Sequence, residues 1–171
     1  WYYNTRQRNL LYFRGVCFTT ATLYWFYQFY VANYNGFGIQ FRYLTIWGLT
    51  GNMIVTGLLF RQTLSKQNEK YFAVVSATCV LNALVMFLYW RLYFIDPKLV
   101  NYSGNIVWFQ EYYLHLLGPL FLFVDSIMFN RSFRQFKIGI ILALLISFSY
   151  VAWTEIVTGP LNSTPVGSKA T

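Results

Sequence analysis

Residues 107–129 read VWFQEYYLHLLGPLFLFVDSIMF, a run long enough to cross a lipid bilayer as one helix. The hydrocarbon layer of a bilayer is about 30 Å thick and takes about 20 apolar residues per helical crossing. The run nevertheless holds Glu111, Pro119, Asp125 and His115, the single histidine of the chain. Ionisable side chains inside such a segment are costly and normally face the protein interior or a water-filled cavity. His115 is therefore the first candidate for a functional residue.

The composition of the chain indicates a polytopic membrane protein. Of its 171 residues, 57% are hydrophobic and only 11% are charged, whereas about 25% are charged in a typical soluble domain. The net charge of +8 comes from basic residues in loops beside apolar runs, so it predicts membrane orientation and no nucleic-acid partner. Cys17 and Cys79 fall inside apolar runs and are expected to be packing residues, not a disulfide or a metal site. One histidine excludes a bis-histidine haem within the chain.

Five apolar runs predict an all-α fold, a polytopic membrane bundle of about five transmembrane helices. The crossings are expected at about 15–33, 40–60, 71–93, 107–129 and 138–158. The segments between them are short and polar, and no repeat or soluble domain interrupts the pattern. Residues 1–158 are therefore expected to form a single transmembrane helical bundle, and residues 159–171 a polar C-terminal tail.

Lysine and arginine predict the orientation of this bundle. Nine of the 13 basic residues fall on one side, in residues 1–14 and in the loops after the second and fourth crossings. Because basic loops stay on the cytoplasmic side, the N-terminus is expected inside. Residues 1–14 combine aromatic rings with Arg6, Arg8 and Arg14, which is typical of a membrane interface.

With this orientation, four polar residues fall in the outer half of the membrane: Thr45, Glu111, His115 and Glu155. Glu111 and His115 are four residues apart and share a helix face. Pro119 has no N–H, so the carbonyl of His115 loses its helical hydrogen bond and we expect a kink there. Asp125 lies toward the inner side and is expected to have a structural role, pairing with Asn52 or a loop arginine.

A stripe of small and polar residues runs along the second crossing at helical spacing, comprising Thr45, Gly48, Asn52 and Thr56. In membranes such stripes normally mark a helix–helix interface, because small residues permit close approach and hydroxyl groups find partners there. We therefore expect Thr50 and Thr56 to be packing residues.

The sequence leaves three roles open for His115. It can hydrogen-bond to a neighbouring helix, act as a general base for a hydroxyl group, or bind a lipid headgroup or a pigment metal. A general base needs its hydroxyl within hydrogen-bond reach. Thr45 is the hydroxyl residue whose expected depth fits best.

Two segments resemble the androgen-induced family, which includes the androgen-dependent TFPI-regulating protein. Residues 41–45, FRYLT, are similar to the opening of a transmembrane helix in that family, and residues 115–119, HLLGP, followed by Asp125, resemble its histidine helix and related bacterial membrane proteins. The resemblance implies a membrane-embedded threonine hydrolase. In characterised members it cleaves branched fatty-acid esters of hydroxy fatty acids, and Thr45 and His115 match the nucleophile and its partner.

If the chain is such an enzyme, its substrate is a lipid ester and an acyl-threonine forms before water hydrolyses it. The developing oxyanion needs a hydrogen-bond donor, for which we consider Asn52 or a backbone N–H. Glu111 or Glu155 is a candidate to orient His115. For such a hydrolase we expect no cofactor.

Non-enzymatic functions also fit the sequence. The chain can be an accessory subunit packed in a larger membrane complex, such as an energy-transducing one, or a lipid- or cofactor-binding bundle without turnover. Transport fits less well, because there is no internal repeat and few paired charges. Membrane lipids are expected partners in every case. A cavity lined by both Thr45 and His115 and open to lipid would favour the enzyme.

Overall fold

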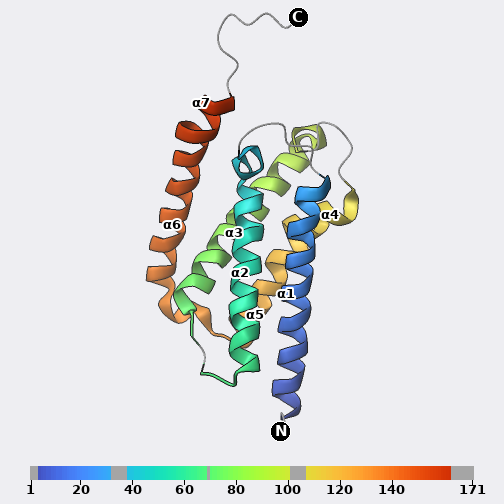
Figure 1. Cartoon of the computed structure of the whole chain (residues 1–171), viewed down its shortest axis with the longest axis vertical. Coiled ribbons are helices and arrows are strands. Elements are labelled where there is room, and N and C mark those ends of the chain that lie inside the picture. Colours follow the sequence, from blue (N-terminus) through green and yellow to red (C-terminus); the bar gives the residue numbers. More distant parts are fainter. Residues whose placement is uncertain (1–3, 32–37, 69, 101–106, 163–171) are drawn as a thin grey trace, which may run out of the picture.

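The computed structural model describes residues 4–31, 38–68, 70–100 and 107–162. These residues are helical with no strand, and five long helices run alternately up and down the molecule (Figure 1). The first three are α1 (Thr5–Val31), α2 (Leu44–Leu64) and α3 (Phe72–Ile95). The all-α prediction is confirmed.

The fourth and fifth helices are composite. The fourth consists of α4 (Trp108–Tyr112), a π-helical turn η3 (Tyr113–Leu117) and α5 (Gly118–Met128). The fifth consists of α6 (Phe136–Ala152), a second π-helical turn η5 (Trp153–Thr158) and α7 (Gly159–Asn162). Short 3-10 helices lie in the connections: η1 (Ile39–Arg42), η2 (Pro97–Leu99) and η4 (Ser132–Gln135).

Two of the long helical segments meet the requirements for crossing a membrane by length and composition. They are α3 and the segment Ser132–Leu161. At about 1.5 Å per residue α1 and α2 are also long enough, but tyrosine, tryptophan and threonine lower their hydropathy. The five-crossing topology and its orientation therefore stay predictions.

The helix boundaries differ from the expected crossings at two places. α1 begins at Thr5, ten residues before the expected start of the first crossing, because the arginine, glutamine and leucine residues of this segment are good helix formers and continue the helix. The fifth helix continues to Asn162, four residues into the expected polar tail, and the rest of that tail lies outside the described residues.

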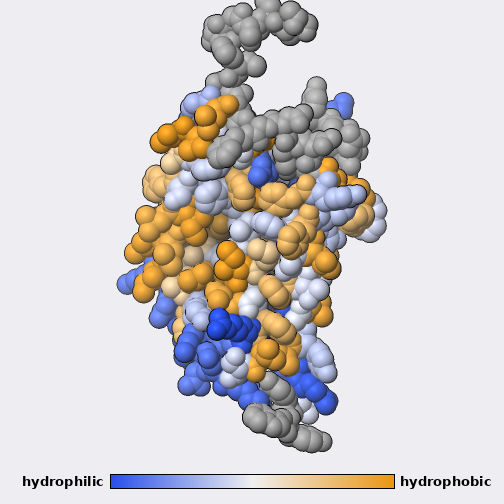
Figure 2. All heavy atoms as spheres, viewed as in Figure 1, coloured by the Kyte–Doolittle hydropathy of each residue, from blue (hydrophilic) through white to orange (hydrophobic). Residues whose placement is uncertain are grey.

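Basic residues gather at one end of the bundle. They come from the start of α1, the end of α2 and the connections that lead into α3 and α6. We call this the basic end, and it comprises Arg6, Arg8, Arg61, Lys66, Lys70, Arg131, Arg134 and Lys137. On the face drawn in Figure 2 hydrophilic surface gathers at this lower end, below a broad hydrophobic band. This separation is what the positive-inside rule requires of a membrane bundle.

The small and polar stripe of α2 faces its neighbours, as expected for a helix–helix interface. A Cβ atom at Gly48 would lie 2.9 Å from Oδ1 of Asn82 on α3. The Asn82 amide donates a 2.6 Å hydrogen bond to Oδ1 of Asn52. On another side of α2, Thr50 accepts a 3.0 Å hydrogen bond from the indole N–H of Trp25 on α1. Close approach and paired polar groups thus hold α2 in the centre of the bundle.

The fifth helix packs mainly on α3. A Cβ atom at Gly139 would lie 2.7 Å from the Cβ atom of Ser76, so the two backbones meet where neither side chain is large. Apart from Gly139 and Ala143, the side chains of α6 are half-buried or exposed. Ile141 and Phe148 are among the exposed ones. Cys17 and Cys79 are buried free cysteines, and their burial agrees with the expected packing role.

A buried ion pair joins the first helix to the fourth. Arg14 was expected at the membrane interface, but it lies within α1 and is only 1% exposed. Its Nε atom donates a 2.7 Å hydrogen bond to Oδ2 of Asp125, and its Nη2 atom donates one of 2.7 Å to Oδ1. Its Nη1 atom donates to Oγ1 of Thr63 on α2 at 2.7 Å.

The prediction that Asp125 pairs with Asn52 or a loop arginine was therefore wrong. Asp125 pairs with Arg14 and not with a loop arginine, while Asn52 pairs with Asn82 instead. The physical reason is that a carboxylate buried in the bundle needs a cation that binds both of its oxygens, and a neutral asparagine amide cannot supply one. The arginine that supplies it is 111 residues away in the sequence.

Removing one partner of this pair should destabilise the protein strongly. Asp125→Asn or Arg14→Met leaves the other charge buried and unpaired, so we expect a loss of about 3–5 kcal/mol in the free energy of unfolding. The double variant Arg14→Met/Asp125→Leu should recover most of that loss. Denaturant unfolding in detergent measures both, with exposed Arg61→Ala as the control, expected within about 0.5 kcal/mol of wild type. A mild effect of either single variant would contradict the buried pair.

Gly139 should be intolerant of a side chain. Gly139→Ala pushes α6 away from α3, and we expect a cost of about 1–3 kcal/mol, measured by the same unfolding assay. Ser76→Gly in the same chain should relieve part of the cost. The exposed neighbour Ile138→Ala is the control and should change little.

Candidate functional site

Thr45 and His115 meet at the end of the bundle opposite the basic end. Thr45 is the second residue of α2, and its Oγ1 atom lies 3.3 Å from Nε2 of His115 on the fourth helix. The preceding chain reaches this point through Gly38, which has a φ of +65°. A Cβ atom there would lie 2.7 Å from the indole ring of Trp153, so this turn requires glycine.

A π-helical turn presents His115 at this position. Pro119 has no N–H to donate to the carbonyl of His115. The N–H of Gly118 bonds to the carbonyl of Tyr113, which makes the backbone π-helical over Tyr113–Leu117. The freed carbonyl of His115 accepts a 2.9 Å hydrogen bond from the indole N–H of Trp90 on α3. The expected loss of the helical hydrogen bond is thus confirmed, and the distortion takes the form of a π-helical turn, a feature frequent at functional sites.

Hydrogen bonding determines which nitrogen of His115 carries the proton. Nδ1 lies 3.0 Å from the backbone carbonyl oxygen of Glu111, which can only accept. Nδ1 is therefore protonated, and Nε2 presents its lone pair to the hydroxyl group of Thr45. The imidazole is buried and stacks face to face on the ring of Tyr89, with ring centroids 3.5 Å apart and planes 6° from parallel. The arrangement is that of a neutral histidine held in one orientation beside a hydroxyl group.

The three supporting residues expected from the sequence lie in different places. Glu111 contributes its main-chain carbonyl to His115, while its carboxylate makes no hydrogen bond to the imidazole. Asn52 lies two helical turns beyond Thr45, about 10 Å along the axis, and bonds to Asn82. Glu155 is exposed in η5, and among the described residues no hydrogen bond or ion pair joins it to His115.

Sequence reasoning missed Tyr89 and Trp90. Both lie near the end of α3, where one stacks on the imidazole and the other bonds the carbonyl of the same histidine. The chain has 15 tyrosines and six tryptophans, so an aromatic pair in an apolar run does not stand out. A periodic pattern on α3 could not indicate which helix those rings face.

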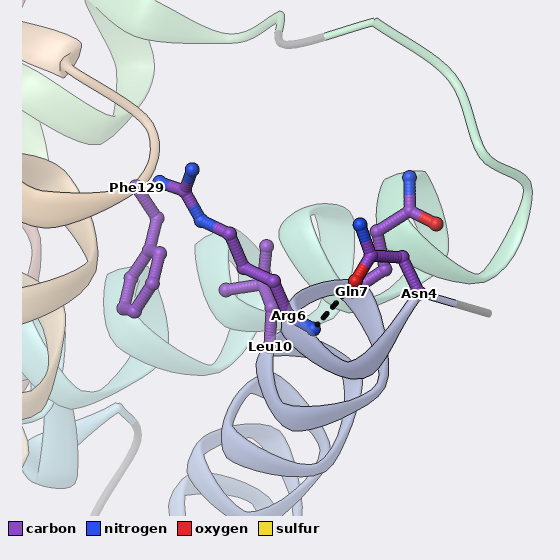
Figure 3. Close-up of a pocket in the computed structure, with 5 residues that line it drawn as sticks. All are labelled: Asn4, Arg6, Gln7, Leu10 and Phe129. Atoms are coloured by element: carbon purple, nitrogen blue, oxygen red, sulfur yellow. Dashed lines mark hydrogen bonds between the residues drawn. The ribbon is translucent and has the colours of Figure 1, made fainter.

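The surface of the described residues includes two hollows that are candidates for ligand binding. One, of about 320 Å³, is at the basic end and is lined by Asn4, Arg6, Gln7, Leu10 and Phe129 (Figure 3). The other, of about 400 Å³, lies along α3 and is lined by Met86, Phe87, Trp90, Arg91 and Phe94. Neither is lined by Thr45 or His115, although the second shares Trp90 with the site. In the part of the chain that the structure describes, no three histidine, cysteine or acidic residues could hold a metal ion together.

The comparison with known families matches this chain over almost its whole length. The family model described as FAR-17a/AIG1-like protein matches residues 7–159, which include Arg14, Thr45, His115 and Asp125. No curated protein and no solved structure matches the chain. Together with two helices apolar enough to cross a bilayer, the match indicates a membrane protein. The chain belongs to the FAR-17a/AIG1-like family, the androgen-induced family to which residues 41–45 and 115–119 pointed.

Proposed function

We propose that this chain is an intramembrane hydrolase of fatty-acyl esters, with Thr45 as nucleophile and His115 as general base. The proposal rests on the 3.3 Å distance from Thr45 Oγ1 to Nε2 of a histidine whose Nδ1 is held by the carbonyl of Glu111. A hydroxyl group is a weak nucleophile until an adjacent base takes its proton, and the base works best when a third group orients it. In this site the orienting group is a main-chain carbonyl.

The chemistry has two halves. Nε2 of His115 takes the hydroxyl proton as Oγ1 of Thr45 attacks the acyl carbonyl carbon, and the imidazolium then gives this proton to the departing alcohol. Water subsequently attacks the acyl-threonine, again with His115 as the base. Because the imidazole is buried, a lasting positive charge on it is unfavourable, which favours return of the proton in each half.

The substrate in this proposal is a lipid ester that enters from the bilayer. The hollow along α3 has an almost wholly apolar lining, and Trp90 connects it to the carbonyl of His115. The indole of Trp90 would separate an acyl chain lying there from His115. We further propose that the protein is integral and multi-pass, with five crossings and the basic end inside.

Labelling with a fluorophosphonate probe for serine and threonine hydrolases tests the nucleophile. Thr45→Ala should abolish labelling because the attacking oxygen is gone, and His115→Ala should slow it by about 10²–10⁴-fold because the base is gone. Thr45→Ser keeps a hydroxyl and should still react. Ser149→Ala, an exposed hydroxyl on α6 whose Oγ bonds to the carbonyl of Leu145, is the control.

Absence of labelling in well-folded wild type would refute the hydrolase. Thr45 and His115 would then hold helices together, and the accessory-subunit interpretation would become the one to test. A larger membrane assembly would be sought as the partner, with the exposed apolar side chains of α6 as the first surface to cross-link.

Trp90→Phe should reduce reactivity more than its effect on stability explains. The substitution leaves the buried carbonyl of His115 without a donor, at a cost of about 1–3 kcal/mol, and loosens the π-helical turn that directs Nε2 at Thr45. The matched control is Trp25→Phe, which removes an indole N–H that bonds to Thr50. We expect slower probe labelling for Trp90→Phe only, with comparable losses of melting temperature in both. Equal labelling rates in the two variants would contradict a positioning role for Trp90.

A further inference from the structure

The basic end of the bundle carries more positive charge than the protein neutralises. Among the described acidic residues only Asp125 lies in the half of the bundle nearer this end, and Arg14 already pairs with it. The other described carboxylates belong to the opposite end. Glu69 lies outside the described residues, and one further carboxylate cannot balance the cations gathered here. A surface with this excess of positive charge attracts anionic partners.

Exposed aromatic rings lie among these cations. In the connection that leads into α6, Phe133 and Phe136 are interleaved with Arg131, Arg134 and Lys137. The two rings are 39% and 46% exposed, and their centroids are 6.2 Å apart. On the face drawn in Figure 2 the hydrophobic band begins directly above the hydrophilic surface of this end. Aromatic rings beside basic residues are typical of the boundary between hydrocarbon and headgroups, so the anionic partner indicated here is a lipid.

The hollow of about 320 Å³ at the basic end combines a cation with apolar surface. Asn4, Arg6 and Gln7 form its polar lining, and Leu10 and Phe129 form its apolar lining. In Figure 3 the side chain of Arg6 extends from α1 toward Phe129, with Leu10 beside it and the amides of Asn4 and Gln7 on the other side. Within the described residues no ion pair engages the guanidinium of Arg6. An anionic group in the hollow would therefore meet a cation whose charge the described residues do not neutralise.

We propose that this hollow binds the headgroup of an anionic phospholipid. The guanidinium of Arg6 donates two parallel hydrogen bonds to phosphate oxygens, a geometry to which the planar guanidinium is suited. Oδ1 of Asn4 already accepts the main-chain N–H of Arg6 at 3.3 Å, so the amide nitrogen of Asn4 is the atom left to donate to the headgroup. The amide of Gln7 supplies a further donor. Leu10 and Phe129 contact the first methylene groups of the acyl chains.

Charge and apolar lining together specify the ligand. Phosphatidylcholine carries a quaternary ammonium group that the surrounding cations repel, whereas phosphatidylglycerol has a net negative charge. Free inorganic phosphate has the charge but offers nothing for Leu10 and Phe129 to contact. The inference is independent of the proposed hydrolase, because the hollow lies at the end of the bundle opposite Thr45 and His115.

Native mass spectrometry of the purified chain in detergent tests the site, because it counts the lipids bound to each chain. Dioleoyl phosphatidylglycerol and dioleoyl phosphatidylcholine are titrated separately, and inorganic phosphate is then added as a competitor. The variant is Arg6→Gln, and the matched control is Arg8→Gln, an exposed arginine on the same helix that does not line the hollow. Both substitutions remove one positive charge from the same turn of α1, so they weaken the general field of the basic end equally.

We expect one phosphatidylglycerol to bind saturably, and phosphatidylcholine to bind about tenfold more weakly or worse. Phosphate at the same concentration should not displace the lipid. Arg6→Gln should weaken phosphatidylglycerol binding about tenfold, because charge-assisted hydrogen bonds are lost, and Arg8→Gln should change it by less than about twofold. Equal losses in the two variants would overturn the site, because the attraction would then come from the general field. Equal binding of the two lipids, displacement by phosphate, or no saturable binding to folded wild type would overturn it as well.

Photolabelling of wild-type protein provides a second test that needs no variant. A phosphatidylglycerol with a diazirine on its headgroup, carried in dioleoyl phosphatidylcholine vesicles, should crosslink to peptides that contain Arg6 or Phe129. Excess unlabelled phosphatidylglycerol should suppress these crosslinks. Crosslinks confined to η4 and the start of α6 would place the lipid on the interleaved aromatic and basic residues of that connection and would overturn its assignment to the hollow.

Discussion

One missing hydrogen bond determines the geometry of the site. Pro119 cannot donate to the carbonyl of His115, and in an apolar environment without water that carbonyl must find another partner. The backbone responds with a π-helical turn, and Trp90 supplies the donor. The same turn leaves the imidazole with Nδ1 on the carbonyl of Glu111 and Nε2 at Thr45. A local defect in the helix thus determines both the direction and the protonation of the histidine.

The half of the bundle nearer the basic end is organised by charge. Arg14 and Asp125 neutralise each other through two hydrogen bonds, and Thr63 takes a third donor of the guanidinium. These contacts join the first, second and fourth helices at a depth where an unpaired charge would be prohibitive. The polar contacts of the opposite half, between Thr45, His115 and Trp90, involve neutral groups only. Anchoring and chemistry therefore occupy opposite halves of the same helices.

Much of the fold and of the candidate site could be predicted from the sequence. The features that could not be predicted have one cause in common. Apolar run length indicated five helices, and the missing N–H of Pro119 indicated a freed carbonyl, because both depend on local chemistry. The partner of Asp125 and the two α3 residues at the imidazole depend on how distant helices rotate about their axes. Glu111 shows the limit well: its spacing from His115 is right for contact, but the contact is made by its backbone oxygen and not its carboxylate.

The π-helical turn changes the angular relation between the two ends of the fourth helix. It inserts one residue into the regular repeat, and in an α-helix one residue corresponds to a rotation of about 100°. The side chains of α4 are consequently rotated about the helix axis relative to where an unbroken continuation of α5 would place them. The ion pair at Asp125 fixes the rotation of α5 about its axis, and the contacts of the π-helical turn fix the rotation of α4. The side chains that α4 presents can therefore change without disturbing the ion pair that anchors α5.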